Sequence, residues 1–199
     1  MTQSTFHYLA EWYQSLAGKR FIQQLAQVLA PKLEARFGYF ALQVEGHWLG
    51  RNLLDTSPVS RKYMLAGNGQ ADVLASPVAL PVASDSVDLV ILPHALSQSP
   101  DFYAALREAD RVLVAEGQLV IIELDPWTVW GSWQRWRQPE SRFYSQLRVK
   151  EALEVLGYQT MACDTLPMLG ADWSKYFANW PKFGKLFDLL GAHFRGCYV

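Results

Sequence analysis

Few residues of this sequence are candidates for a catalytic role, and His94 is the strongest of them. His94 directly follows Val87–Leu92, an apolar run that is short, rich in β-branched residues and typical of a strand buried on both faces. At the end of such a strand, a histidine could line a pocket or accept a proton from an acceptor nucleophile. A second interpretation keeps His94 as a hydrogen-bonded structural histidine that caps the following loop.

Other catalytic signatures are absent from the sequence. It has no G-x-S-x-G nucleophile elbow, and its four histidines lack metal-ligand spacing, so no metal site is predicted. Cys163 and Cys197 form no C-x-x-C pair, and we expect both to be buried thiols.

The elements that position His94 can be read from the residues around it. A second apolar run, Leu119–Leu124, follows a segment with helical spacing, Phe102–Val114. A strand, a helix and a strand predict a right-handed βαβ unit in a parallel sheet. Ligands of such sheets bind beyond the carboxyl ends of the strands, which places Pro93-His94 and Asp125-Pro126 at the functional edge.

The stretch LPVASDSVDLVILPHALSQSPDFYAALREADRVLVAEGQLVII carries a family resemblance. It resembles the second half of class I S-adenosylmethionine-dependent methyltransferases, in the methyltransferase type 11 branch. That branch has an LPF-x-D-x-S-x-D loop, a histidine after the fourth strand and an L-R-E-x-x-R-V-L helix. The resemblance implies an α/β fold with a Rossmann-like methyltransferase sheet, mostly parallel with a last antiparallel strand. It also implies S-adenosyl-L-methionine as the cofactor, which carries the reactivity itself.

The front half of the chain keeps less of the family pattern. The first predicted strand, Tyr39–Val44, is followed by EGHWLG, where the family has a D/E-x-G-x-G-x-G turn, so the glycine-rich cofactor loop is degenerate. Gln43 stands where the strand-end acid is expected, and Glu45 lies two residues later. Asn68 replaces the acid that holds the ribose, and Ser76 the acid that accepts from adenine. The cofactor contacts that the resemblance implies are therefore Gln43, Glu45, Gly46, Asn68, Ser76, Pro77, Pro93 and His94.

The next two predicted strands, Arg61–Ala66 and Val73–Ala75, are joined by a very short connection. The family has a crossover helix there, but AGNGQ is far too short for one, and Asn68-Gly69 is a hairpin signal. Either these strands pair antiparallel or one assignment is wrong.

Residues 1–38 are predicted to form a helical extension. Apolar residues recur at helical intervals over 11–37, and Pro31 is expected to kink or divide the segment. In the resembling family such an extension often covers the substrate side of the pocket, whereas the simpler interpretation is packing on the sheet.

A tryptophan-rich segment follows the second strand of the βαβ unit. Its tryptophans, at 127, 130, 133 and 136, recur every three residues, so on a helix they sweep about half of the circumference and cannot share one core stripe. The resemblance places Asp125, Trp127 and Trp130 beside the acceptor substrate. The alternatives are a peripheral membrane surface or protein partner, supported by nearby arginines, or simple capping of the sheet edge.

The C-terminal part predicts a helix over Leu147–Leu156, a strand over Tyr158–Cys163 and a last strand over Phe194–Val199. In the family the last strand inserts antiparallel next to the fifth. We expect a single methyltransferase-like domain over 1–199, with a core over 39–199 and aromatic-rich insertions at 126–146 and 170–192.

The composition of the chain limits which kinds of partner it can have. Its 199 residues, 50% of them hydrophobic and 19% charged, indicate a folded protein, and a net charge of −1 gives no overall attraction for nucleic acid. No apolar run is long enough for a membrane span, and we expect a cytoplasmic protein. The functional hypothesis is methyl transfer to an apolar or aromatic small molecule. The alternative is a catalytically inactive, methyltransferase-like interaction module.

Overall fold

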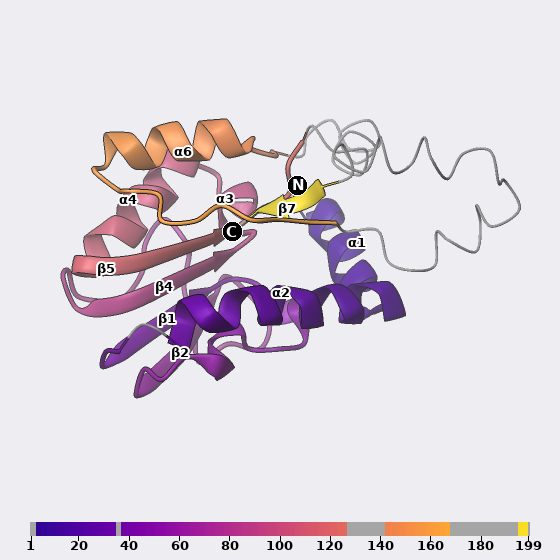
Figure 1. The fold of residues 1–199 in the computed structure, drawn as a ribbon, viewed down its shortest axis with the longest axis horizontal. Coiled ribbons are helices and arrows are strands. Elements are labelled where there is room, and N and C mark those ends of the chain that lie inside the picture. Colours follow the sequence, from indigo (N-terminus) through magenta and orange to yellow (C-terminus); the bar gives the residue numbers. More distant parts are fainter. Residues whose placement is uncertain (1–2, 35–36, 127–141, 168–194, 199) are drawn as a thin grey trace, which may run out of the picture.

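Five parallel strands form the centre of the computed structural model, which describes residues 3–34, 37–126, 142–167 and 195–198 (Figure 1). The sheet has the order β3-β2-β1-β4-β5. Its strands are β1 (Phe40–Val44), β2 (Arg61–Ala66), β3 (Val73–Leu74), β4 (Val87–Pro93) and β5 (Leu113–Ile122). The chain builds outward from β1 in one direction and then returns to add β4 on its other side. The boundary between β1 and β4 is therefore the topological switch point of the sheet.

The predicted βαβ unit is confirmed. β4 and β5 run parallel, with Val90 opposite Leu119 and Leu92 opposite Ile121. Between them lies α4 (Phe102–Val112), which begins where the Asp101 side chain accepts a hydrogen bond of 3.0 Å from the Ala104 N–H. A four-residue helix, α3 (Ala95–Gln98), precedes it.

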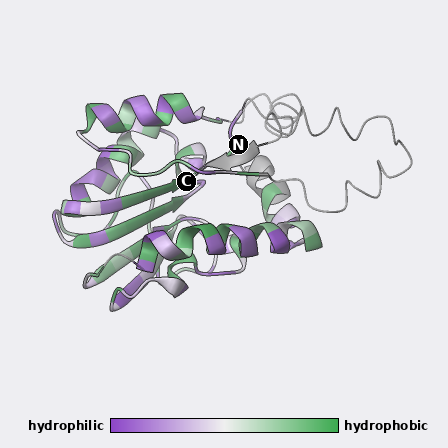
Figure 2. Cartoon of the chain, viewed as in Figure 1, coloured by the Kyte–Doolittle hydropathy of each residue, from purple (hydrophilic) through white to green (hydrophobic). Residues whose placement is uncertain are grey.

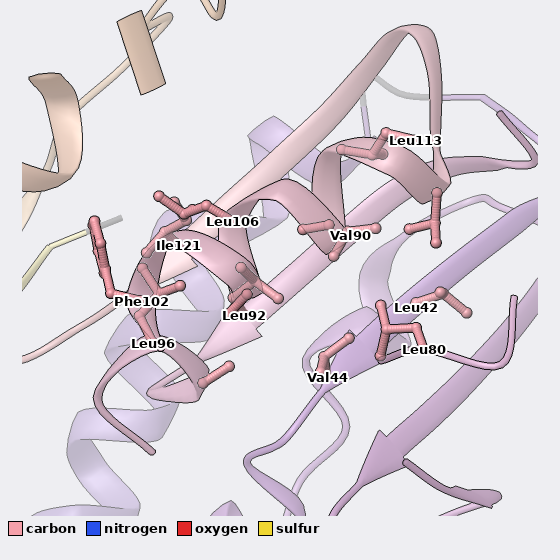
Figure 3. Close-up of a cluster of buried hydrophobic side chains, with 14 of the residues drawn as sticks. Leu42, Val44, Leu80, Val90, Leu92, Leu96, Phe102, Leu106, Leu113 and Ile121 are labelled. Carbon is pink, nitrogen blue, oxygen red and sulfur yellow. The ribbon is translucent and has the colours of Figure 1, made fainter. Parts of the chain in front are cut away.

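Side chains alternate along the strands and supply a separate core on each face of the sheet. Figure 2 shows that β5 becomes hydrophobic toward its carboxyl end. Leu42, Val90 and Leu92 point toward α4 and α6 (Gln146–Val155), in the cluster that Figure 3 shows. Their neighbours Leu89 and Ile91 point to the opposite face, against the N-terminal helices. Because both faces of β4 are covered, its sequence is a continuous apolar run rather than an alternating one.

Two N-terminal helices cover that opposite face, α1 (Gln3–Gln14) and α2 (Leu16–Glu34). The division into two helices was predicted, but its predicted position at Pro31 is wrong. The break falls at Ser15, whereas α2 continues through Pro31 to Glu34 and buries Leu29 and Leu33 on either side of it. The Ser15 hydroxyl accepts from the Gly18 N–H at 3.1 Å and so caps the second helix.

Gly18 lets the two helices cross at close range. A β-carbon at this position would lie 2.2 Å from the Trp12 carbonyl oxygen and 2.4 Å from Tyr13 Cα, both of them backbone atoms. We expect Gly18→Ala to lower the free energy of unfolding by about 2–3 kcal/mol, because α1 must move away from α2. Urea denaturation measures this loss.

Gly157→Ala is the matched control. Gly157 has a φ of 88°, but a β-carbon there would meet nothing within 4 Å. Only backbone strain remains, at about 1 kcal/mol. Equal losses in the two variants would contradict a close helix crossing at Gly18.

The connection between β2 and β3 shows that both alternatives drawn from the sequence, an antiparallel pair or a wrong strand assignment, are wrong. Both strands are present, and they pair parallel, with Leu65 opposite Val73 and Ala66 opposite Leu74. A six-residue link suffices because only two residue pairs form the ladder. The Asp72 side chain accepts from the Met64 N–H at 2.7 Å and fixes the returning chain.

The C-terminal part also departs from prediction. α6 is confirmed and ends before Gly157, but Tyr158–Cys163 forms no strand. The short strands β6 (Thr165–Pro167) and β7 (Arg195–Tyr198) pair antiparallel with each other, so the last strand is antiparallel but does not extend β5. Cys163 is exposed rather than buried. The insertions at 126–146 and 170–192, including Trp127 and Trp130, lie largely outside the described residues.

In the parts of the chain that the structure describes, no helix combines the length and the apolar character that crossing a bilayer requires.

Candidate functional site

The switch point brings two loops together, Glu45–Trp48 after β1 and Pro93-His94 after β4. Glu45 and Gly46 both adopt left-handed backbone conformations, with φ of 68° and 74°. A β-carbon at Gly46 would lie 2.8 Å from Pro93 Cβ, so only glycine allows this approach. A one-turn 3-10 helix, His47–Leu49, follows in place of the long helix typical of such folds.

Glu45 reaches from β1 to the end of the neighbouring strand β2. Its N–H donates to the Leu65 carbonyl at 2.7 Å, and its Oε1 accepts from the Gly67 N–H at 2.8 Å. Only 5% of the residue is exposed. Burial raises the pKa of the Glu45 carboxyl, and the hydrogen bond from Gly67 offsets part of that effect.

The raised pKa predicts how Glu45 affects stability. Because its ionised form is less favourable in the folded chain than in the unfolded one, ionisation costs folding free energy above the raised pKa, and this cost vanishes below the ordinary value of 4.5. Glutamine carries no such cost and retains an acceptor for Gly67. We therefore expect Glu45→Gln to be at least as stable as the wild type near neutral pH and to lose any advantage in acid. Urea denaturation at both pH values checks this, and a variant less stable at neutral pH would contradict it.

His47 occupies the space beside Gly69. A β-carbon at Gly69 would lie 2.4 Å from His47 Nε2, so the imidazole packs directly on this glycine. His47 Nδ1 lies 3.9 Å from Glu45 Oε2. Burial lowers the pKa of His47, which favours its neutral form.

His94 is enclosed by two aromatic rings. Its Nε2 lies 2.9 Å from the Tyr13 hydroxyl, and its ring stacks on Trp48 with centroids 5.6 Å apart and planes at 24°. Tyr13 also contacts Trp48, with centroids 5.2 Å apart. His94 is 1% exposed. Helix α1 therefore reaches the switch point, as the extension of the resembling family does, and it also packs on the sheet.

Glu123 lies fully buried below His94. Its Oε1 accepts from the N–H groups of Leu96 and Ser97, at 2.9 and 3.1 Å, and its Oε2 accepts from the Ser97 hydroxyl. The carboxylate therefore caps α3. His94 Nδ1 is 3.9 Å from Glu123 Oε2, too far for a hydrogen bond.

Three buried polar atoms at the switch point have no hydrogen-bond partner among the described residues: His47 Nδ1, Trp48 Nε1 and His94 Nδ1. Buried polar groups without partners are rare, because each loses its hydration without compensation. Their convergence indicates a place for a polar ligand or ordered water. Within the same described part of the chain, no group of three or more histidine, cysteine, aspartate or glutamate side chains could hold a metal.

The remaining predicted site residues differ in burial. Gln43 is fully buried and structural, because its amide donates to the Glu45 carbonyl and accepts from the Leu53 N–H. Asn68 and Ser76 are exposed beyond β2 and β3, and Pro77 is buried beside them. Asp125 is half-buried after β5.

Comparison with known proteins supports this fold. Residues 48–121 match a family model described as a methyltransferase domain. The chain is 29% identical over 166 residues to an uncharacterised Escherichia coli K12 protein, YafS, with 80% of this chain and 68% of that protein aligned.

Solved structures extend the similarity over nearly the whole chain. An S-adenosylmethionine-dependent methyltransferase from Archaeoglobus fulgidus superposes with a TM-score of 0.66 over 97% of this chain and 96% of its own, at 12% identity. The chain therefore has the fold of the S-adenosylmethionine-dependent methyltransferases, and its central part matches a methyltransferase domain. A second solved structure, a Haloferax volcanii putative methyltransferase in complex with the Trm112 activator, gives a TM-score of 0.63 over 85% of this chain and 81% of its own, at 18% identity.

The match to a methyltransferase domain, together with the fold, indicates S-adenosylmethionine as the cofactor. The switch point fits its polar groups, because three unpartnered polar atoms and the Glu45 carboxylate meet there. The part of the site that would hold adenosine has fewer suitable groups, because His47 packs on Gly69 and no acidic residue ends β2.

Two residues of this site were missed from the sequence, Tyr13 and Glu123. Glu123 had a signal, because it is a single acid within the apolar run 119–124. Tyr13 had none, because it meets His94 only through the docking of α1 across 81 residues of sequence.

Proposed function

We propose that this protein transfers a methyl group from S-adenosylmethionine to an apolar or aromatic small molecule. The observation that carries the proposal is the set of buried, unpartnered atoms of His47, Trp48 and His94 at the switch point of a methyltransferase sheet. Unsatisfied groups of this kind are retained where a ligand completes them.

The cofactor, when bound, supplies an activated methyl group, so the protein needs to contribute mainly position and desolvation. Gly46 and Pro93 would hold the methionine end, and the aromatic rings of Tyr13 and Trp48 exclude water from His94. A proton released by the acceptor would reach His94 Nε2 through the Tyr13 hydroxyl, 2.9 Å away.

The acceptor side of the proposal rests on aromatic residues. Asp125 lies at the carboxyl edge of the sheet, and Trp127 and Trp130 follow it in sequence. An apolar acceptor suits such side chains. A cytoplasmic location and a peripheral contact of the tryptophan-rich segment with a membrane or protein remain parts of this proposal.

An interaction module that has lost cofactor binding is the second candidate. Two side chains favour it. His47 and Glu45 stand in the turn after β1, where a standard cofactor turn has glycines, and they reach Gly69 and Gly67. In such a protein, exposed aromatic residues would form the contact surface.

Isothermal titration with S-adenosylhomocysteine separates the two candidates. Binding in the micromolar range supports the enzyme, whereas the absence of heat up to millimolar ligand supports the module. A screen of apolar acceptors with labelled S-adenosylmethionine then identifies the substrate. Failure of every acceptor class despite donor binding would contradict methyl transfer to an apolar molecule.

A further inference from the structure

The end of β2 lacks the acid that nucleotide-binding sheets use to hold a ribose. In Rossmann-type sheets this acid follows the glycine-rich turn by about 20 residues and accepts hydrogen bonds from the ribose hydroxyls. Here β2 ends at Ala66, and the next two residues are Gly67 and Asn68. Neither offers a carboxylate.

The carboxylate of Glu45 lies at that same strand end, although the residue belongs to β1's loop. Its Oε1 is held by the Gly67 N–H at 2.8 Å. Among the described residues, no hydrogen bond reaches its Oε2, and His47 Nδ1 lies 3.9 Å from this oxygen, too far for one. One oxygen thus anchors the side chain to β2, and the other remains available for a ligand.

We propose that Glu45 is the ribose-binding acid of this protein, replacing from β1 the carboxylate that β2 lacks. The inference rests on the proposed function, because it assigns a role within the same donor site. A carboxylate suits the two neighbouring hydroxyls of a ribose, because it presents two acceptor oxygens in one plane. Gly67 is exposed beside the Glu45 carboxylate, and the His47 ring packs on the neighbouring Gly69.

The strained backbone at Glu45 suggests that its side chain has a role. A φ of 68° is unfavourable for a residue with a β-carbon, and glycine would relieve it. Glu116 has a similar φ of 62°, so strain alone does not mark a site. Glu45 differs because it is buried and spans two strands, whereas Glu116 is exposed in the turn inside β5.

The test compares two probes on three proteins. S-adenosylhomocysteine and its 2′,3′-dideoxy analogue are titrated calorimetrically into the wild type, Glu45→Gln and Glu116→Gln. Hydrogen bonds to a charged group predict that loss of the hydroxyls weakens wild-type binding about 10–100-fold. Glu45→Gln should bind S-adenosylhomocysteine more weakly by a similar factor and distinguish the two probes hardly at all. Glu116→Gln should match the wild type.

Each outcome decides between the assignments. If the wild type binds S-adenosylhomocysteine and Glu45→Gln keeps both its affinity and its preference for the hydroxyls, the role of Glu45 is overturned and the proposed function stands. If the wild type binds neither probe, both fall. Glu45→Gly, which relieves the left-handed backbone while removing the carboxylate, repeats the test in a second variant should the glutamine variant fold poorly.

Discussion

Replacing His94 by glutamine is expected to lower the rate of methyl transfer about 100-fold or more and the affinity for S-adenosylhomocysteine by about 10-fold or less, the loss of one hydrogen bond. Glutamine can still form a hydrogen bond with the Tyr13 hydroxyl, 2.9 Å from His94 Nε2, but it cannot accept the proton of the acceptor. Single-turnover rates with labelled S-adenosylmethionine check this.

Two tyrosine variants provide the controls for His94. Tyr13→Phe keeps the ring against Trp48 but removes the hydroxyl, so it should slow transfer as His94→Gln does, and combining the two changes should add little. Tyr39→Phe alters an exposed ring elsewhere and should have no effect. An unchanged rate in His94→Gln would make this residue a structural histidine, the alternative that the sequence left open.

Replacing Glu123 by alanine is expected to lower the free energy of unfolding by about 3–5 kcal/mol. The change leaves the N–H groups of Leu96 and Ser97 and the Ser97 hydroxyl without their buried acceptor. It also opens a cavity below His94. Guanidinium denaturation measures the loss.

Glu123→Gln separates the acceptor role of Glu123 from its volume. The amide keeps one oxygen for the backbone of α3 and nearly the same size, so we expect about half of the alanine penalty. A loss below about 1 kcal/mol in the alanine variant would show that water replaces the carboxylate, contrary to its complete burial.

The back half of the chain was predictable because its signals are local. Val87–Leu92 is apolar on both faces, the helix between the strands carries its own cap at Asp101, and the connection is long enough for a crossover. These features together permit few alternatives to a parallel pair. The start of β5 was predicted too late. The strand begins at Leu113, because the turn at Glu116 lies within it.

The errors arose where structure depends on partners distant in sequence. Tyr158–Cys163 has the composition of a strand, but the described residues offer it no neighbour to complete a ladder. Pro31 was overrated because its cost is one hydrogen bond and a local clash with the preceding turn, which the burial of Leu29 and Leu33 outweighs. The parallel pairing of β2 and β3 depends on Asp72, a single side chain whose role no periodicity reveals.

For four of the predicted site residues the structure shows a common location, while their roles stay predictions. Glu45, Gly46, Pro93 and His94 do meet at the switch point, because strand ends converge there in any sheet of this order. Gln43 was misread, because a polar residue at a buried strand end can serve the loop above it rather than a ligand. Tyr13 was beyond prediction, since its contact with His94 depends on how α1 docks.

The docking of α1 and α2 bears on where this protein can be cut. The methyltransferase family match begins at residue 48, so a fragment designed on its borders would omit β1 and both N-terminal helices. One side of the remaining sheet would then expose Leu89, Ile91 and Val120 to water, because Leu25, Leu29 and Leu33 would no longer cover them. The border of the family match in this chain therefore cuts through one of its two hydrophobic cores.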